Sequence, residues 1–206
     1  DLALLSRLAA CPVCGQQFAD QPSEPGLSAD DLVSALLQLV APQILKLLEL
    51  GIDVIPLREG AKKPIAKNWT RRRPASQWRY ILSLGKMFNI GVRCGGKADL
   101  VIIDCEDFET YWKIRQWLET HNIQDFIVVR TCSGEGYHIW LRCKNRPRDK
   151  NQAYRFIDPD FGKGEIRFDS GAQCAIPPSV ATSSKNNSTG QYLFEDDSAL
   201  DTFASM

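Results

Sequence analysis

Two acidic residues separated by one position, Asp104 and Glu106, end the apolar run Leu100–Ile103. A short apolar run rich in β-branched residues predicts a buried strand, here over 100–106. Side chains alternate along a strand, so both carboxylates should lie on one face at its C-terminal end. A divalent cation with oxygen ligands, Mg²⁺ or Mn²⁺, would offset their repulsion. The alternative is a solvated acidic turn at an exposed strand end, with Asp107 as a third charge.

A glycine-rich turn over 131–136 precedes an alternating strand over 137–142. Gly134 and Gly136 would let backbone amides approach a phosphate group closely. His138 lies at the start of the strand, beside the turn. It is a candidate ligand-binding residue, and the alternative is a core histidine on a sheet.

A later strand over 164–169 places Glu165, Arg167 and Asp169 on one face. Glu165 is the better candidate for a third catalytic acid because it lies inside the strand. Asp169 precedes Ser170 and Gly171, where an Asp commonly accepts hydrogen bonds from nearby amides. Arg167 could pair with Glu165 or reach a triphosphate, and the sequence leaves both open.

Residues 58–79 are strongly basic, although the net charge of the whole chain is zero. The neutral total excludes a uniformly basic surface but permits a local patch. Trp69 and Trp78 are interleaved with the basic residues, a pattern that suits phosphates and stacked bases. The alternative is a solvated loop with tryptophans anchored in the core. The residues expected to contact nucleic acid are Lys62, Lys63, Lys67, Arg71, Arg72 and Arg73.

Seven cysteines, an odd number, suit reduced thiols in a cytoplasmic protein better than a disulfide framework. Cys11 and Cys14 form half of a zinc-ribbon pattern. They would bind Zn²⁺ only with ligands from outside this chain, and the alternative is a turn without metal. No signal peptide is visible, and no apolar run approaches the roughly 18 residues of a membrane span. The first residue is Asp, so we expect a piece of a longer protein.

The chain divides into an N-terminal segment over 1–27 and a main domain over 28–206. Within the main domain we expect an N-terminal module (28–98), a sheet that carries the acids (99–182), and a polar loop with an acidic tail (183–206). Helical spacing from Ser28 is interrupted by Pro42 and ends at Gly51. Further predicted elements are strands over 52–57, 89–94 and 126–130 and a helix over 108–120.

In order, the motifs are Asp104-x-Glu106, Ser133-Gly-Glu-Gly-Tyr-His138, and Glu165-Ile-Arg167 ahead of Ala175-Ile-Pro-Pro-Ser179. This set resembles the primase-polymerase branch of the archaeo-eukaryotic primase superfamily. The resemblance covers about 40–180. It is supported by Gly51-Ile-Asp-Val-Ile-Pro56, by Lys62-Lys-Pro64 followed by Trp69, and by Asn89-Ile-Gly-Val92.

The resemblance implies an α+β fold: a mixed sheet like an RNA-recognition fold, flanked by helices, with an N-terminal α/β module. It also implies that Asp104, Glu106 and Glu165 bind two divalent metal ions, Mg²⁺ or Mn²⁺. Ser133 and His138 would contact the phosphates of the incoming nucleotide. Their spacing is looser than the compact Ser-x-His of some relatives, and the third acid is Glu where the family often has Asp.

The function that follows is template-directed nucleotidyl transfer by a DNA primase/polymerase. Its partners would be nucleoside triphosphates, a single-stranded DNA template or primer-template, and a helicase or other domains of a longer polypeptide. One alternative is a catalytically inactive module that binds single-stranded nucleic acid. The other is a metal-dependent nuclease of the relaxase type, which generally needs a histidine-rich metal site. This chain has only two histidines, His121 and His138.

Overall fold

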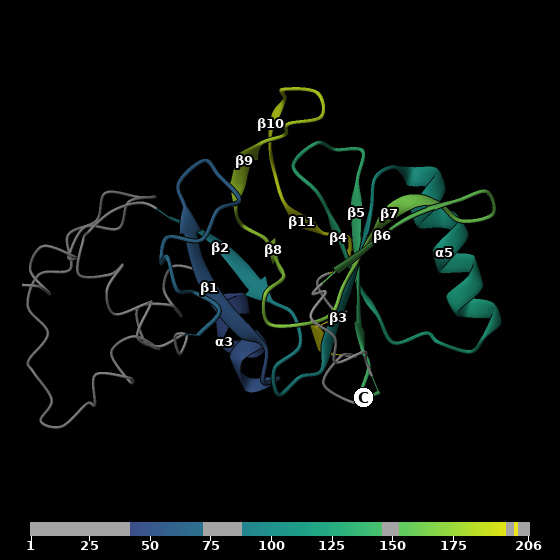
Figure 1. Cartoon of the computed structure of the whole chain (residues 1–206), viewed down its shortest axis with the longest axis horizontal. Helices are drawn as coiled ribbons and strands as arrows, with labels where there is room; N and C mark the ends of the chain where they lie inside the picture. Colours follow the sequence, from purple (N-terminus) through teal and green to yellow (C-terminus); the bar gives the residue numbers. More distant parts are fainter. Residues whose placement is uncertain (1–41, 72–87, 146–152, 197–199, 202–206) are drawn as a thin grey trace, which may run out of the picture.

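The computed structural model describes residues 42–71, 88–145, 153–196 and 200–201. Its elements are mostly β-strands with few helices, which confirms the α+β class (Figure 1). Several sequence predictions lie outside these residues. They are the Cys11/Cys14 pair, the helix that starts at Ser28, Arg72, Arg73 and Trp78.

A six-stranded sheet carries the candidate catalytic residues. Its members in chain order are β3 (Leu100–Cys105), β4 (Ile127–Arg130), β5 (Tyr137–Arg142), β6 (Ala153–Asp158), β7 (Gly162–Arg167) and β11 (Leu193–Phe194). The spatial order is β11-β4-β5-β3-β7-β6, and every neighbouring pair is antiparallel. The predicted mixed sheet was therefore wrong. Helix α5 (Phe108–Thr120) joins β3 to β4, which run in the same direction, but β5 lies between them.

A smaller sheet has the order β1-β2-β8, formed by β1 (Asp53–Arg58), β2 (Phe88–Arg93) and β8 (Gln173–Ala175). Helix α3 (Pro42–Glu49) precedes it, and Gly51 follows its end as the predicted C-terminal cap. Gly51 has a φ of +76°, which favours glycine, and the Ile52 amide donates to the Leu47 carbonyl at 2.9 Å. A hairpin of β9 (Val180–Thr182) and β10 (Thr189–Gln191) projects at the top of Figure 1.

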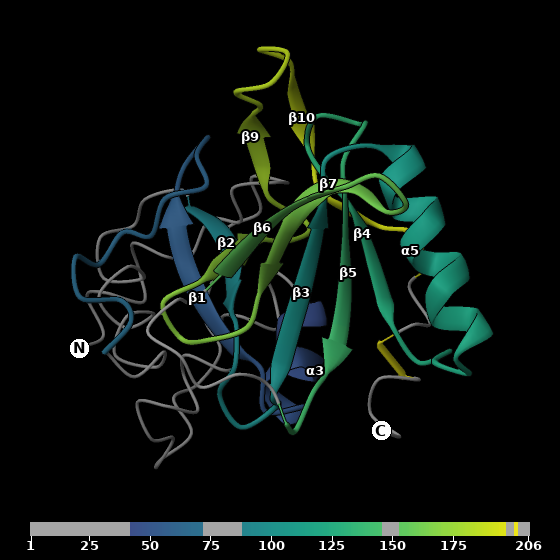
Figure 2. The same cartoon turned by 45° about the vertical axis from the view of Figure 1, so that its right-hand side comes forward.

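The two faces of the large sheet are buried in different ways, and this determines where the site lies. Ile102 and Trp140 belong to the core that is shared with the small sheet. Ile103 and Ile139 pack instead with residues of α5, which covers the opposite face (Figure 2). Because side chains alternate along a strand, Asp104 lies on the same face as Ile102, toward the small sheet.

Several strand assignments differ from the sequence predictions. The predicted strand over 164–169 is β7, which ends at Arg167 and forms a hairpin with β6, a strand the sequence pattern missed. The predicted loop and tail over 183–206 contain β10 and β11. Strand β11 adds an edge to the large sheet by pairing with β4. Among the described residues, no helix is long and apolar enough to cross a membrane.

Candidate active site

Asp104 lies near the end of β3, between two neighbouring strands. In the register of the sheet it is opposite His138 on β5 and opposite Glu165 on β7. Its Oδ1 is 3.6 Å from His138 Nε2, and its Oδ2 accepts a hydrogen bond from Arg167 Nη2 at 2.9 Å. The sheet therefore brings together four of the predicted site residues.

Arg167 holds both carboxylates at once. Its Nη2 is also 2.7 Å from Glu165 Oε2, and its Nη1 donates to the Gln173 carbonyl at 2.7 Å. Of the two roles left open by the sequence, pairing with Glu165 is the one present in this structure, and Asp104 is a second partner. The Arg167 Nε is buried without a hydrogen-bond partner among the described residues.

Glu106 is the first residue after β3, so the predicted strand was one residue too long. Its side chain is half exposed, and its carboxylate is 3.1 Å from Lys163 Nζ. Within the described part of the chain, no three His, Cys, Asp or Glu side chains are gathered closely enough to hold a metal ion. Instead, each predicted metal ligand is paired with a cationic side chain, either Arg167 or Lys163. Asp169, the rival third acid, accepts from the Ser170 amide at 2.6 Å, as a turn residue does.

His138 is almost completely buried, with only 4% of its surface exposed. Burial lowers its pKa from 6.5 to about 4, although the nearby Asp104 carboxylate opposes the shift. The imidazole is therefore neutral near pH 7. Its Nδ1 has no hydrogen-bond partner among the described residues, and its ring lies 5.9 Å from that of Tyr192.

The glycine turn is held by its own hydrogen bonds. The Gly134 amide donates to the Thr131 carbonyl at 2.9 Å, and the Gly136 amide donates to Ser133 Oγ at 3.2 Å. A Cβ at Gly136 would lie 2.9 Å from Thr131 Oγ1, so the close packing of the turn requires glycine there. Both glycine amides expected to face a phosphate are thus already bonded, while Ser133 lines the pocket.

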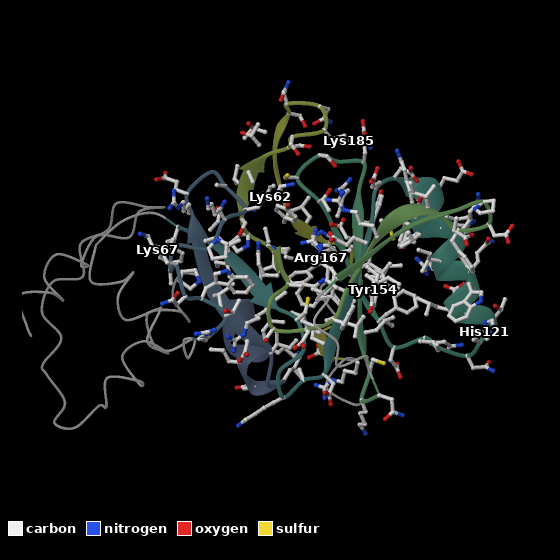
Figure 3. The ribbon with its side chains drawn as sticks, viewed as in Figure 1. Lys62, Lys67, His121, Tyr154, Arg167 and Lys185 are labelled. Carbon is white, nitrogen blue, oxygen red and sulfur yellow. The ribbon has the colours of Figure 1, made fainter. Side chains whose placement is uncertain are left out.

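Positive side chains from distant segments also reach this region. Figure 3 shows Lys62, Arg167 and Lys185 near the junction of the two sheets, with Lys67 further out beside the small sheet. Lys62 Nζ lies 5.9 Å from the centre of the Tyr192 ring. Lys185, in the β9–β10 loop, pairs with Glu135 at 2.8 Å and donates to the Glu106 carbonyl at 3.0 Å. Lys63, Lys67 and Arg71 are exposed.

Side chains from both sheets and their loops line a pocket of about 330 Å³ between the two sheets. Residues that the sequence predicted as site residues form part of its wall: Lys62, Asp104, Glu106, Ser133, Gly136, His138 and Arg167. Residues that it missed form another part: Thr131, Gln173, Lys185 and Tyr192. Gln173 Oε1 is buried without a hydrogen-bond partner among the described residues. No local pattern marks Lys185 or Tyr192, because only the tertiary fold brings them to the acids.

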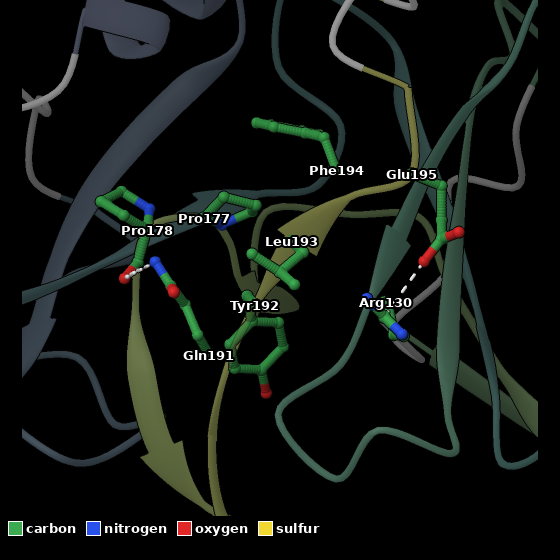
Figure 4. A pocket seen from close by; sticks show the side chains of 8 residues that line it. All are labelled: Arg130, Pro177, Pro178, Gln191, Tyr192, Leu193, Phe194 and Glu195. Carbon is green, nitrogen blue, oxygen red and sulfur yellow. Dashed lines mark hydrogen bonds and ion pairs between the residues drawn. The ribbon is translucent and has the colours of Figure 1, made fainter.

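A second pocket, of about 310 Å³, shares the Tyr192 wall (Figure 4). Its lining combines apolar residues, among them Pro177, Pro178 and Leu193, with polar ones such as Gln191. At one side Arg130 pairs with Glu195 at 3.2 Å. Tyr192 therefore separates the charged pocket from a less charged neighbour.

Two further sequence motifs have structural roles behind the pocket. The buried Ser179 hydroxyl donates to the Ile90 carbonyl at 2.9 Å and accepts from the Ile90 amide at 2.7 Å. Asn89 donates to the Val180 carbonyl at 2.6 Å and to the Ala61 carbonyl at 3.1 Å. Through these bonds the Pro-Pro-Ser segment and the Asn-Ile-Gly-Val segment fix β8 and β9 against β2.

Comparison with known proteins supports the family suggested by the motifs. The family model Prim-Pol, described as bifunctional DNA primase/polymerase, N-terminal, matches residues 44–203, well over half of the chain. No curated protein matches the chain. A DNA primase/polymerase domain acts on nucleic acid and nucleoside triphosphates, and its family generally depends on divalent metals. The chain therefore belongs to the Prim-Pol family of bifunctional DNA primase/polymerase N-terminal domains.

Proposed function

We propose that this chain catalyses template-directed transfer of a nucleotide from a nucleoside triphosphate to a 3′-hydroxyl. The observation that carries the proposal is the composition of the 330 Å³ pocket. Acids and cations line the same pocket, with Asp104 and Glu106 opposed by Lys62, Arg167 and Lys185. A triphosphate needs cationic partners, and the acids suit the divalent metals on which the family depends.

Asp104, Glu106 and Glu165 are the proposed ligands of two divalent ions, Mg²⁺ or Mn²⁺. The fit rests on two carboxylates that converge on one positive atom, because Arg167 Nη2 lies 2.9 Å from Asp104 and 2.7 Å from Glu165. Hard oxygen donors aimed at a common point suit such cations. Glu106 would join them by leaving Lys163. Bound metal would supply activation of the 3′-hydroxyl and stabilisation of the leaving pyrophosphate.

His138 and Ser133 are the proposed phosphate contacts. The imidazole is neutral near pH 7, so one of its ring nitrogens carries a proton that it would donate to a phosphate oxygen. Gly134 and Gly136 shape the turn that presents Ser133 to the pocket. Lys62 and Lys185 both line the pocket and would offset the charge of the triphosphate.

Lys63, Lys67 and Arg71 follow Lys62 in the chain, are exposed and do not line the pocket, and we assign single-stranded template or primer-template DNA to these residues. A helicase or further domains are proposed partners. The order β4-β5-β3-β7, with α5 on one face, is the support for an RNA-recognition-like primase core.

The test is incorporation of a labelled nucleotide with Mg²⁺ or Mn²⁺, on single-stranded templates with and without a primer. Asp104→Asn keeps the size of the side chain and should abolish incorporation while leaving DNA binding intact. Asp125→Asn, an exposed acid that does not line the pocket, is the matched control. A wild-type chain that binds template but incorporates nothing would instead support the inactive binding module.

A further inference from the structure

We propose that Arg167 is an internal competitor of the divalent metal, which must displace the guanidinium from Asp104 and Glu165 in order to bind. This inference rests on the proposed function, since it concerns the same acids. It adds that the site carries its own counter-ion when metal is absent.

The contacts of Asp104 show why the two cations compete. Both of its oxygens already have a neighbour, His138 Nε2 at 3.6 Å from Oδ1 and Arg167 Nη2 at 2.9 Å from Oδ2. The same Nη2 lies 2.7 Å from Glu165 Oε2. A metal ion held by these two acids would compete with Arg167 for the same carboxylate oxygens, and two cations repel strongly at such separations.

The anchoring of Arg167 shows that this arrangement is built into the fold. Nη1 donates to the Gln173 carbonyl on β8 at 2.7 Å, so the guanidinium is held from the small sheet as well as from the acids. About a quarter of each of the three side chains is exposed, at 25% for Arg167, 27% for Asp104 and 26% for Glu165. Two carboxylates this close and this buried need a counter-charge, and Arg167 supplies one.

Competition of this kind lowers the apparent affinity for metal, because the paired state must be broken before the ion binds. Hydrogen bonds between charged groups are among the stronger ones in proteins, and the metal must break two of them to bind. Removing the guanidinium should therefore tighten metal binding roughly tenfold or more. The protein without metal should at the same time become less stable, because Asp104 and Glu165 lose their counter-charge.

The experiment measures Mn²⁺ binding to the full chain without nucleotide or DNA, from the electron paramagnetic resonance signal of free Mn²⁺. The variants are Arg167→Gln and, as the matched control, Lys62→Gln. Lys62 lines the same pocket with the same charge, and its described side-chain contact is with the Tyr192 ring. We expect tighter binding in Arg167→Gln and a much smaller change in Lys62→Gln. The melting temperature should rise more on adding Mn²⁺ in Arg167→Gln than in the wild type.

Asp104→Asn shows which bound Mn²⁺ belongs to the proposed site, because an ion held by Asp104 should no longer bind in that variant. If the wild type binds Mn²⁺ through Asp104 and Arg167→Gln binds it equally or less tightly, the competition is refuted and the metal assignment stands. If neither the wild type nor Arg167→Gln binds Mn²⁺ through Asp104, both proposals fail. Should Arg167→Gln not fold, Arg167→Lys keeps the charge but loses the forked contact. It should then show a smaller tightening, and unchanged or weaker binding would overturn the inference.

Discussion

Gly164 controls the spacing between the two strands that carry the proposed metal ligands. It lies on β7 opposite Cys105, directly before Glu165. A Cβ placed on Gly164 would be 2.4 Å from the Asp104 carbonyl oxygen and 2.8 Å from Phe156 Cζ. Real Cβ atoms essentially never approach closer than 3.0 Å, so Gly164→Ala must push β7 away from β3 by about 0.6 Å. Overpacking of this kind typically costs about 1–3 kcal/mol of stability.

The same displacement should affect catalysis more than stability. Catalytic groups need placement within about 0.5 Å, and a shift of about 1 Å can cost about 100-fold in rate. We expect Gly164→Ala to lower nucleotide incorporation roughly tenfold or more, measured well below its melting temperature. Gly91→Ala is the control, since its Cβ would meet the Cys174 carbonyl at 3.0 Å in the small sheet. If both variants lost similar stability and incorporated nucleotide equally well, the spacing of β3 and β7 would not govern the reaction.

Three other measurements test separate parts of the structure. The folded-state pKa of His138 is about 4 and its ordinary value is 6.5, so the unfolded chain binds the extra proton first as the pH falls. The wild type should lose up to about 3 kcal/mol of stability between pH 6.5 and 4 relative to His138→Gln. If the free energy of unfolding changed equally with pH in both proteins, this would be contradicted. Replacing Lys62, Lys63 and Lys67 with Gln should lower the salt slope of single-stranded DNA binding by about 2, and an unaltered slope would remove this surface from the interface. Ser179→Ala should lower the free energy of unfolding by about 1–3 kcal/mol, because it breaks both hydrogen bonds to Ile90, and should preserve nucleotide incorporation at low temperature. An unchanged melting temperature would refute the role of that hydroxyl.

The elements with strong local signals were predicted well from the sequence. Helix α5 has the predicted bounds. The Asp107 side chain caps its start by accepting a hydrogen bond from the Thr110 amide at 2.8 Å. Strand β5 also has its predicted bounds, 137–142. The missed strands lack such signals: β6 is an edge strand with mostly exposed or half-exposed side chains, and β11 has only two residues. Nothing local in either segment separates a strand from a loop.

The residues of the site were easier to predict than their contacts. Asp104, His138 and Glu165 were proposed as site residues from motifs, and the register of β3 brings them together. The simultaneous pairing of Arg167 with two acids depends on that register, which no local pattern encodes. The same is true of Lys185, since the hairpin that carries it reaches the end of β3 only in the folded chain.

Gln173 links the acids to the loop that carries the predicted DNA contacts. Its carbonyl accepts from Arg167, and its side-chain Nε2 donates to the Lys62 carbonyl at 2.8 Å. A chain of bonds thus runs from the large sheet, which holds the acids, to a loop of the small sheet. In the proposed function, a displacement of Gln173 would therefore act on two places at once, because this residue holds both the guanidinium beside the acids and the loop of Lys62.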